Sequence, residues 1–164
     1  MSRVQITSGP FEMIKNSRKF KRRRNSIEVI GKKDLEEEIK NLKKSNQLII
    51  VEGDHDKEAL QKLGLENIFV INKTGISLYN RIEEVVNRLG RKEKCVILTD
   101  FDKKGRKLYD LLKKEFVKQG IKINNDIRFI LLKKRLSHIE GLANFYEHLK
   151  NEIYKKRNKD FRNR

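Results

Sequence analysis

The chain has 164 residues, a length that suits one compact domain, and 40 Lys and Arg residues against 23 Asp and Glu give it a net charge of +17. No apolar run approaches the roughly 20 residues of a membrane span, and no apolar signal segment follows the basic N-terminus. The single cysteine, Cys95, excludes an intramolecular disulfide and a cysteine-cluster zinc site. We therefore expect a soluble, cytoplasmic protein that binds a polyanion.

The excess of basic residues lies mainly at the two ends of the chain. Residues 1–24 contain eight basic residues and one acidic residue, a net charge of +7. Residues 150–164 contain seven basic and two acidic residues, a net charge of +5. We therefore expect three parts: a flexible basic arm over 1–24, a folded domain over 25–149 and a basic tail over 150–164.

The basic arm has several possible roles. Clustered Lys and Arg side chains neutralise phosphates and release counterions, which favours nucleic-acid binding by Lys19, Lys21, Arg22, Arg23 and Arg24. A solvated tail that keeps the protein soluble would have a similar composition. So would a nuclear import signal or an organellar transit peptide, and composition alone leaves all of these open.

Amphipathic helices and short apolar blocks alternate along the chain. The 3.6-residue spacing of apolar side chains predicts helices over 34–44, 56–63, 79–89 and 103–119, and another from about residue 137. Short apolar runs predict strands over 47–51, 68–71, 95–99 and 127–132. Apolar strands without polar alternation are typical of a parallel sheet covered on both faces. The sequence thus predicts a compact Rossmann-like α/β fold with about four parallel strands flanked by helices.

Acidic residues follow two of the predicted strands. Glu52 directly follows the first apolar run, and Asp100 and Asp102 follow the third. Ligand sites in open parallel sheets lie beyond the carboxyl ends of the strands. If these two strands are neighbours, the three carboxylates converge, and such a group repels itself unless a cation lies between its members. Oxygen ligands of this kind suit Mg²⁺ or Mn²⁺, which predicts a metal site at this edge.

Other interpretations of the acidic residues were weighed. Asp56 or Asp102 taken singly fits an acid at a helix N-terminus, interacting with the helix dipole, although this does not account for both clusters. A calcium-binding EF-hand loop that starts at Asp100 fails, because Lys104 and Leu111 stand where oxygen ligands are needed. No Gly-x-Gly-x-x-Gly dinucleotide motif follows the first strand and no P-loop is present, so NAD binding and P-loop ATP hydrolysis are not expected.

Two motifs carry a family resemblance. The first is Val51-Glu52-Gly53-x-x-Asp56-x-x-Ala59-Leu60, and the second, about fifty residues later, is Asp100-x-Asp102-x-x-Gly105. Together they resemble the Toprim domain over residues 47–132. Topoisomerases of types IA and II, bacterial-type primases, some nucleases and recombination proteins share this domain. Within it, the chain is similar to small stand-alone archaeal proteins and to the bacterial nuclease that matures 5S ribosomal RNA. Phe101 departs from the proline often found inside the second motif.

The resemblance implies a Rossmann-like fold that binds Mg²⁺ and acts on phosphodiester bonds. It implies that Glu52 moves protons or joins the metal shell, and that Asp100 and Asp102 are metal ligands. Asp56 would support the first motif, and Gly53 and Gly105 would be turn glycines. Lys73, Lys103, Lys104 and Arg106 flank the acidic loops and either hold phosphates or are solvated surface residues.

Three functions were compared on this basis. The expected one is a nuclease that depends on Mg²⁺, with Mn²⁺ as the alternative ion, and that acts on nucleic acid, with RNA favoured over DNA. The alternative is a non-catalytic Toprim module that docks on ribosomal RNA or on a nuclease assembly. A weaker third reading is a topoisomerase-like or primase-like subunit that works with a separate partner.

Further residues near the two motifs have both structural and functional interpretations. His138 and Glu140 follow the fourth predicted strand and face the same edge if that strand joins the sheet, while Ser137 and Glu140 also match a helix capping box. His55 received no role. Cys95 starts a predicted buried strand and is expected in the core.

Overall fold

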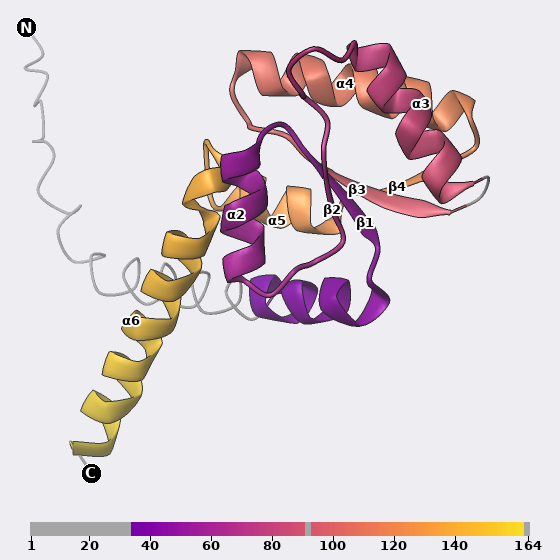
Figure 1. Ribbon diagram of the computed structural model, residues 1–164. Helices are drawn as coiled ribbons and strands as arrows, with labels where there is room; N and C mark the ends of the chain where they lie inside the picture. The colour runs from indigo at the N-terminus through magenta and orange to yellow at the C-terminus, as the bar shows by residue number, and fades with distance from the viewer. Residues whose placement is uncertain (1–33, 91–92, 163–164) are drawn as a thin grey trace, which may run out of the picture.

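The computed structural model describes residues 34–90 and 93–162 (Figure 1). A helix over residues 34–45 precedes the first strand. In chain order there follow β1 (Leu48–Val51), α2 (Asp54–Lys62), β2 (Ile68–Val70), α3 (Leu78–Leu89), β3 (Lys94–Leu98), α4 (Lys103–Lys118), β4 (Lys122–Asn124), α5 (Asp126–Lys133), the 3-10 turn η2 (Ile139–Gly141) and α6 (Leu142–Arg162). The predicted basic arm lies outside the described residues.

The four strands form one parallel sheet in the order β2-β1-β3-β4. β1 and β3 are its central strands, and Val51 is paired with Leu98 where they end. All four residues of β1 are buried, as are the last four of β3. This confirms the predicted Rossmann-like α/β fold with its fully buried central strands.

Helices cover both faces of the sheet because alternate strand residues point to opposite sides. Ile49 and Val51 of β1 pack into a core with the helix over 34–45, α2, α5 and α6. Leu48 and Ile50 pack on the other face with α3 and α4. Figure 1 shows α3 and α4 together on one side of the sheet. The parallel connections place the turns after β1 and β3 at one edge, between these two layers.

The fourth strand was assigned to the wrong segment. Residues 127–132 form most of α5, and the strand is β4, which has only three residues. Ile127 and Leu131 are buried one helical turn apart, whereas Phe129 and Leu132 are exposed. A short apolar run does not by itself distinguish a buried strand from a helix, and the edge position of β4 allowed a sequence with two polar residues out of three.

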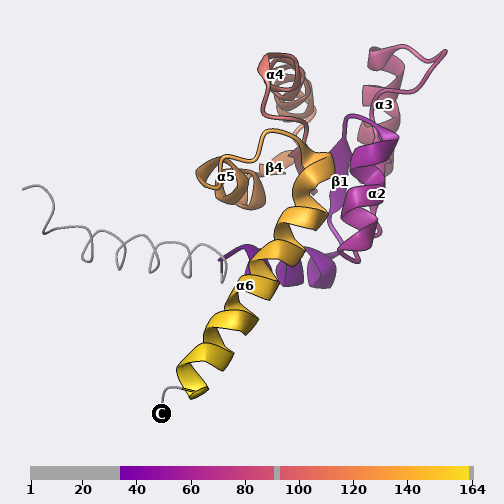
Figure 2. The same cartoon turned by 90° about the vertical axis from the view of Figure 1, so that its left-hand side faces the viewer.

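The predicted boundary at residue 150 falls inside a helix. α6 continues without interruption to Arg162, so residues 150–162 of the predicted basic tail belong to this helix. Figures 1 and 2 show this helix running out beyond the other elements. None of the helices within 34–90 and 93–162 combines the length and apolar character needed to cross a membrane.

Candidate active site

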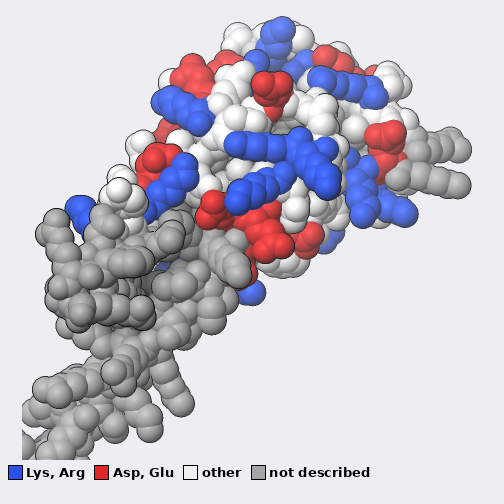
Figure 3. Space-filling model, turned by 90° about the horizontal axis from the view of Figure 1, so that it is seen from below, with Lys and Arg blue, Asp and Glu red and all other residues white. Residues whose placement is uncertain are grey.

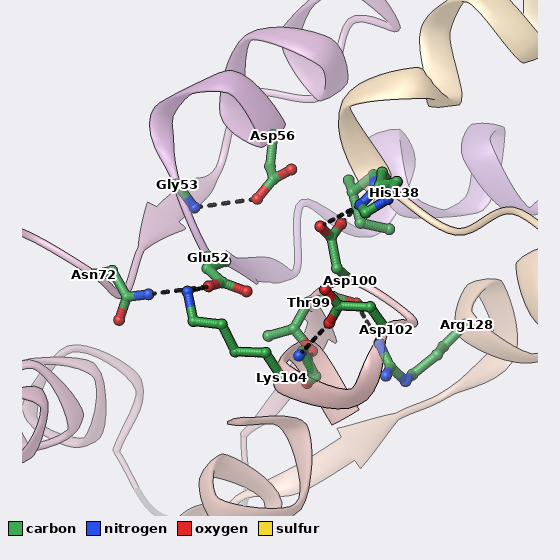
Figure 4. A network of polar contacts seen from close by, with 12 residues as sticks. Glu52, Gly53, Asp56, Asn72, Thr99, Asp100, Asp102, Lys104, Arg128 and His138 are labelled. Atoms are coloured by element: carbon green, nitrogen blue, oxygen red, sulfur yellow. Dashed lines mark hydrogen bonds and ion pairs between the residues drawn. The ribbon is translucent and has the colours of Figure 1, made fainter. Parts of the chain in front are cut away.

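Glu52, Asp100 and Asp102 lie at the carboxyl edge of the two central strands (Figure 4). Glu52 follows β1, and the two aspartates follow β3. Because β1 and β3 are adjacent and in parallel register, both acidic loops leave the sheet side by side. The predicted site required the strand before Glu52 and the strand before Asp100 to be neighbours. The pairing of β1 with β3 confirms this.

Glu52 is held by two polar side chains, one on the loop after β2 and one in the first turn of α4. Lys104 Nζ donates a hydrogen bond to Glu52 Oε1 at 2.7 Å, and Asn72 Nδ2 donates to the same oxygen at 3.4 Å. The Glu52 side chain is only 16% exposed, whereas that of Lys104 is 79% exposed. The ammonium of Lys104 therefore reaches in from solvent and neutralises a largely enclosed carboxylate. The pKa of Lys104 is raised, first by its hydrogen bond to Glu52 and then by the charges of Glu52, Asp102 and Asp100.

Asp100 uses both of its carboxylate oxygens. The backbone N–H of Ile139 donates to Oδ1 at 2.8 Å, and His138 Nδ1 lies 2.8 Å from Oδ2. The hydrogen bond to Asp100, followed by the negative charge of Asp100, raises the pKa of His138. His138 thus faces the acidic edge as expected, but it arrives on the loop before η2 and not at the end of a strand.

Asp102 caps the N-terminus of α4. Its Oδ1 accepts a hydrogen bond from the Gly105 N–H at 2.7 Å, and the carbonyl of Gly105 accepts one from Thr99 Oγ1 at 2.7 Å. The helix N-terminal interpretation of Asp102 is therefore correct. The same is true of Asp56, whose Oδ2 accepts from the Gly53 N–H at 3.1 Å at the start of α2.

The two motif glycines differ in what the fold requires of them. A Cβ on Gly105 would lie 2.3 Å from the carbonyl oxygen of Asp100, so only glycine lets α4 approach the acidic loop this closely. Gly53 has an extended backbone with φ of −139°, and a Cβ there would meet nothing within 4 Å. The apo fold thus gives no steric reason for glycine at position 53.

Asp56 is a buried carboxylic acid beside the acidic loops, with 8% of its surface exposed. Burial is the main cause that raises its pKa, and the charges of Asp100, Glu52 and Glu140 add to the effect, while the Gly53 N–H opposes it. The folded state therefore disfavours the ionised form of Asp56.

We expect Asp56→Asn to raise the melting temperature of the metal-free protein at pH 7. The wild type loses stability as the pH rises through the raised folded-state pKa, because ionised Asp56 is better solvated in the unfolded chain. Asparagine keeps an oxygen for Gly53 and carries no charge, so the gain should shrink towards zero below the ordinary aspartate pKa. Thermal melts in EDTA from pH 3 to 8 measure this difference. Glu58→Gln, at an exposed position of α2, is the control, and an equal gain at every pH would contradict the expectation.

The donor chemistry of this edge fits a hard divalent cation. Three carboxylates that leave adjacent loops offer the oxygen ligands that Mg²⁺ and Mn²⁺ prefer. Two side chains already lie against them: the ammonium of Lys104 at Glu52 and the imidazole of His138 at Asp100. Among residues 34–90 and 93–162, however, no three His, Cys, Asp or Glu side chains are gathered closely enough to hold a metal ion. A single ion held by all three carboxylates therefore requires them to move closer together than they are here.

We expect Lys104→Met to strengthen Mg²⁺ binding several-fold. In the wild type a cation must displace the Lys104 ammonium from Glu52, and the variant removes this competitor. Titration calorimetry without nucleic acid measures the affinity. Lys107→Met, on an exposed position of the same helix, is the matched control. Unchanged or weaker binding by Lys104→Met would show that the ion pair does not compete with the metal.

The remaining predicted site residues either are exposed on the surface or lie outside the residues that the structure describes. Lys73, Lys103, His55 and Glu140 are exposed, and the basic residues Lys19, Lys21, Arg22, Arg23 and Arg24 lie outside the described ranges. Cys95 is buried as expected, and burial raises the pKa of its thiol to about 12. The predicted capping box at Ser137 is wrong. The N-cap of η2 is His138, without a side-chain cap, and the carbonyl of Ser137 accepts from the Phe101 N–H.

Sequence reasoning missed three residues that shape the site. Asn72 contacts Glu52, Thr99 joins the end of β3 to α4, and Arg128 donates to the carbonyl of Thr99. Thr99 and Asn72 lie just after strands, and this position in the sequence could have identified them as site residues. Arg128 gave none, because its segment was assigned to a strand.

A family model described as the Toprim domain matches residues 47–131. This is more than half of the chain, which therefore belongs to the Toprim domain family. The matched range agrees with the residues that carried the resemblance in the sequence.

Individual relatives and a solved structure show in more detail what this chain is similar to. A UPF0292 protein of Methanocaldococcus jannaschii is 42% identical over 101 residues, which are 59% of this chain and 76% of the relative. The solved structure of an Aquifex aeolicus protein is similar with a TM-score of 0.55 and 33% identity, over 64% of this chain and 94% of that one. Ribonuclease M5 of Mesoplasma florum is 31% identical over 68 residues, 42% of this chain and 39% of the ribonuclease. The expected likeness to small stand-alone archaeal Toprim proteins is thus confirmed.

Proposed function

We propose that this chain is a divalent-metal-dependent phosphodiesterase of nucleic acids, and that structured RNA is its substrate. Family membership and the similarity to a ribonuclease indicate a role connected with nucleic acid. The observation that carries the catalytic proposal is the placement of Glu52, Asp100 and Asp102 on adjacent loops at one sheet edge. RNA is preferred to DNA because the named relative is a ribonuclease.

Asp100, Asp102 and Glu52 are the residues that would hold the metal ion. A bound Mg²⁺ supplies Lewis-acid polarisation of a phosphoryl oxygen and lowers the pKa of a coordinated water. Glu52 lies on the loop after β1 with its side chain only 16% exposed, and we assign it the role of accepting or donating a proton. A positioned general acid or base of this kind contributes about 10²–10⁴-fold to a rate.

Basic residues around this edge would hold the phosphate chain. Lys104 is exposed and pairs with Glu52, so its side chain can turn towards a phosphate when the carboxylate takes up a metal. Figure 3 views the molecule from below Figure 1, on the side of the helix over 34–45 and away from this edge; basic and acidic side chains lie next to one another there, so that face is not uniformly positive. The sequence assigns most of the excess charge to the two ends, and residues 1–24 would supply long-range attraction for a polyanion.

The test is to incubate the purified full-length chain with structured and single-stranded RNA and DNA, with Mg²⁺, Mn²⁺ or EDTA. We expect cleavage of structured RNA with metal only, and its loss in Asp100→Ala and Asp102→Ala. Melting curves must show that these variants remain folded, because Asp102 also caps α4. Cleavage that survives either substitution in a folded variant would overturn the metal-site assignment.

A binding module remains the second candidate, and one observation favours it. Each carboxylate of the site is engaged by protein groups, and the described residues hold no ready group of three metal ligands. Tight RNA binding without turnover under every metal condition would support this candidate and contradict the phosphodiesterase.

Deleting residues 1–24 should flatten the salt dependence of nucleic-acid binding under either candidate. The segment holds eight of the basic residues, and each phosphate contact contributes about 0.7–0.9 to the slope of log affinity against log salt. Fluorescence anisotropy with labelled RNA from low to high salt measures the slope. An unchanged slope would show that the segment makes no phosphate contacts.

A further inference from the structure

Arg128 is a buried arginine directly beneath the acidic loop. It lies on α5 and is only 5% exposed. Its Nη1 donates a hydrogen bond of 2.7 Å to the carbonyl of Thr99. Its guanidinium carbon lies 4.6 Å from the centre of the Phe101 ring and 4.1 Å from the centre of the Tyr109 ring. The guanidinium is therefore fixed by the end of one strand, where Figure 4 shows it beside Thr99, and by two aromatic faces.

These contacts hold both sides of Asp100. The carbonyl of Thr99 precedes this residue and the Phe101 ring follows it, so Arg128 restrains the backbone on either side of the carboxylate. The effect extends to Asp102 through Thr99. The Thr99 hydroxyl donates to the carbonyl of Gly105, whose N–H donates to the Asp102 carboxylate. One side chain is thus connected to both aspartates of the second motif.

Arg128 makes no direct ion pair with a carboxylate of the described residues, although the negative charges of Asp110 and Asp100 favour its ionised form. It takes part in none of the salt bridges formed among the described residues. Arg81 provides the comparison, because it too is buried, lies over an aromatic ring and donates to a strand-end carbonyl, that of Val70. Arg81, however, pairs with Glu84. A buried guanidinium without such a partner is costly unless other groups compensate for it, and the nearby acidic loop provides negative charge.

We propose that Arg128 is the positioning residue of the acidic loop, holding Asp100 and Asp102 in place through Thr99 and Phe101. The link to catalysis rests on the proposed function, but the positioning itself does not. Only arginine meets both requirements here. Lysine would donate to Thr99 without stacking as a plane between two rings, and methionine would fill the space without donating.

Amide hydrogen exchange tests the positioning without metal or substrate. The Gly105 and Ile139 N–H groups are bonded to Asp102 and Asp100, so their exchange reports whether these carboxylates stay in place. In full-length Arg128→Lys and Arg128→Met, we expect exchange at these two amides to speed up by about tenfold or more, relative to the amides of β1. Arg81→Lys should destabilise the fold without this selective change.

Mn²⁺ affinity and kinetics give a second readout. We expect Arg128→Lys to weaken Mn²⁺ binding about tenfold, as loss of an outer supporting group does, while Arg81→Lys leaves it unchanged. If the wild type cleaves RNA, kcat should fall in Arg128→Lys with little change in KM. If it cleaves nothing, the proposed function fails, yet the exchange data still decide the role of Arg128. Exchange at Gly105 and Ile139 that rises only in step with the whole protein, or equally in Arg81→Lys, would overturn the proposal.

Discussion

Gly105→Ala is expected both to destabilise the protein and to eliminate the RNA cleavage proposed for it. The new methyl group would lie 2.3 Å from the carbonyl oxygen and 2.9 Å from the Cα of Asp100, contacts that no side-chain rotation can relieve. The first turn of α4 must therefore move away from the acidic loop. This movement breaks the cap from Asp102 and the bond from Thr99. We expect a loss of about 1–3 kcal/mol from overpacking and about 1 kcal/mol from the lost cap.

Chemical denaturation of Gly105→Ala measures this loss, and Gly53→Ala is its matched control. Position 53 has room for a Cβ and an extended backbone, so alanine there should cost much less stability than at position 105. Equal losses at the two positions, or a Gly105→Ala protein as stable as the wild type, would mean that α4 does not depend on its close approach to Asp100.

Glu52→Gln is expected to lower the rate of RNA cleavage by about 10²–10⁴-fold while leaving the fold intact. Glutamine has the same shape, retains an oxygen for Asn72 and Lys104, and cannot transfer a proton at neutral pH. Single-turnover rates at saturating Mg²⁺ and RNA separate this effect from weaker binding.

Glu140→Gln is the matched control for Glu52→Gln. Glu140 is an exposed acid on η2 near the same edge, and its substitution should change the rate little. A loss of less than about tenfold in Glu52→Gln would contradict the proton-transfer role, since that role alone accounts for more. A similar loss in both variants would point to the general negative charge of the edge.

Local patterns were enough to predict most of the fold. The apolar blocks that form β1, β2 and β3 are short, and they lie between segments with a clear 3.6-residue period. The length of the blocks therefore indicated strands, and the period of their neighbours indicated helices. The helix over 103–119 was expected from its apolar spacing, and α4 covers Lys103–Lys118. The prediction of the fourth strand was wrong because the more apolar segment was taken for the strand. β4 is short and partly exposed at the sheet edge, whereas the adjacent α5 has the more apolar sequence.

The part of the candidate site that could be predicted consists of residues that directly follow strands. Glu52, Asp100 and Asp102 follow buried strands, and parallel topology brings such positions to one edge. The partners of these acids could not be predicted in the same way. Lys104 reaches Glu52 across 52 positions of sequence, and His138 reaches Asp100 across 38. Arg128 depends on how α5 packs under the loop, which no pattern within its own segment indicated.

The departure from the family pattern at Phe101 has a structural counterpart. The ring packs on the guanidinium of Arg128, so the side chain takes part in holding the acidic loop. A proline would restrict the loop through its own backbone, whereas Phe101 does so through a contact with another helix. The substitution therefore leaves a restrained loop between Asp100 and Asp102.

The most direct measurement is the rate at which the purified full-length chain cleaves structured RNA as Mg²⁺ is titrated, for the wild type, Asp100→Asn and Asp102→Asn. Asparagine keeps a carbonyl oxygen for the Ile139 or Gly105 N–H and removes the charge that a metal needs. We predict a rate that saturates with Mg²⁺ in the wild type and is lost in both variants. Cleavage that continues in EDTA, or at the wild-type rate in either variant, would contradict it.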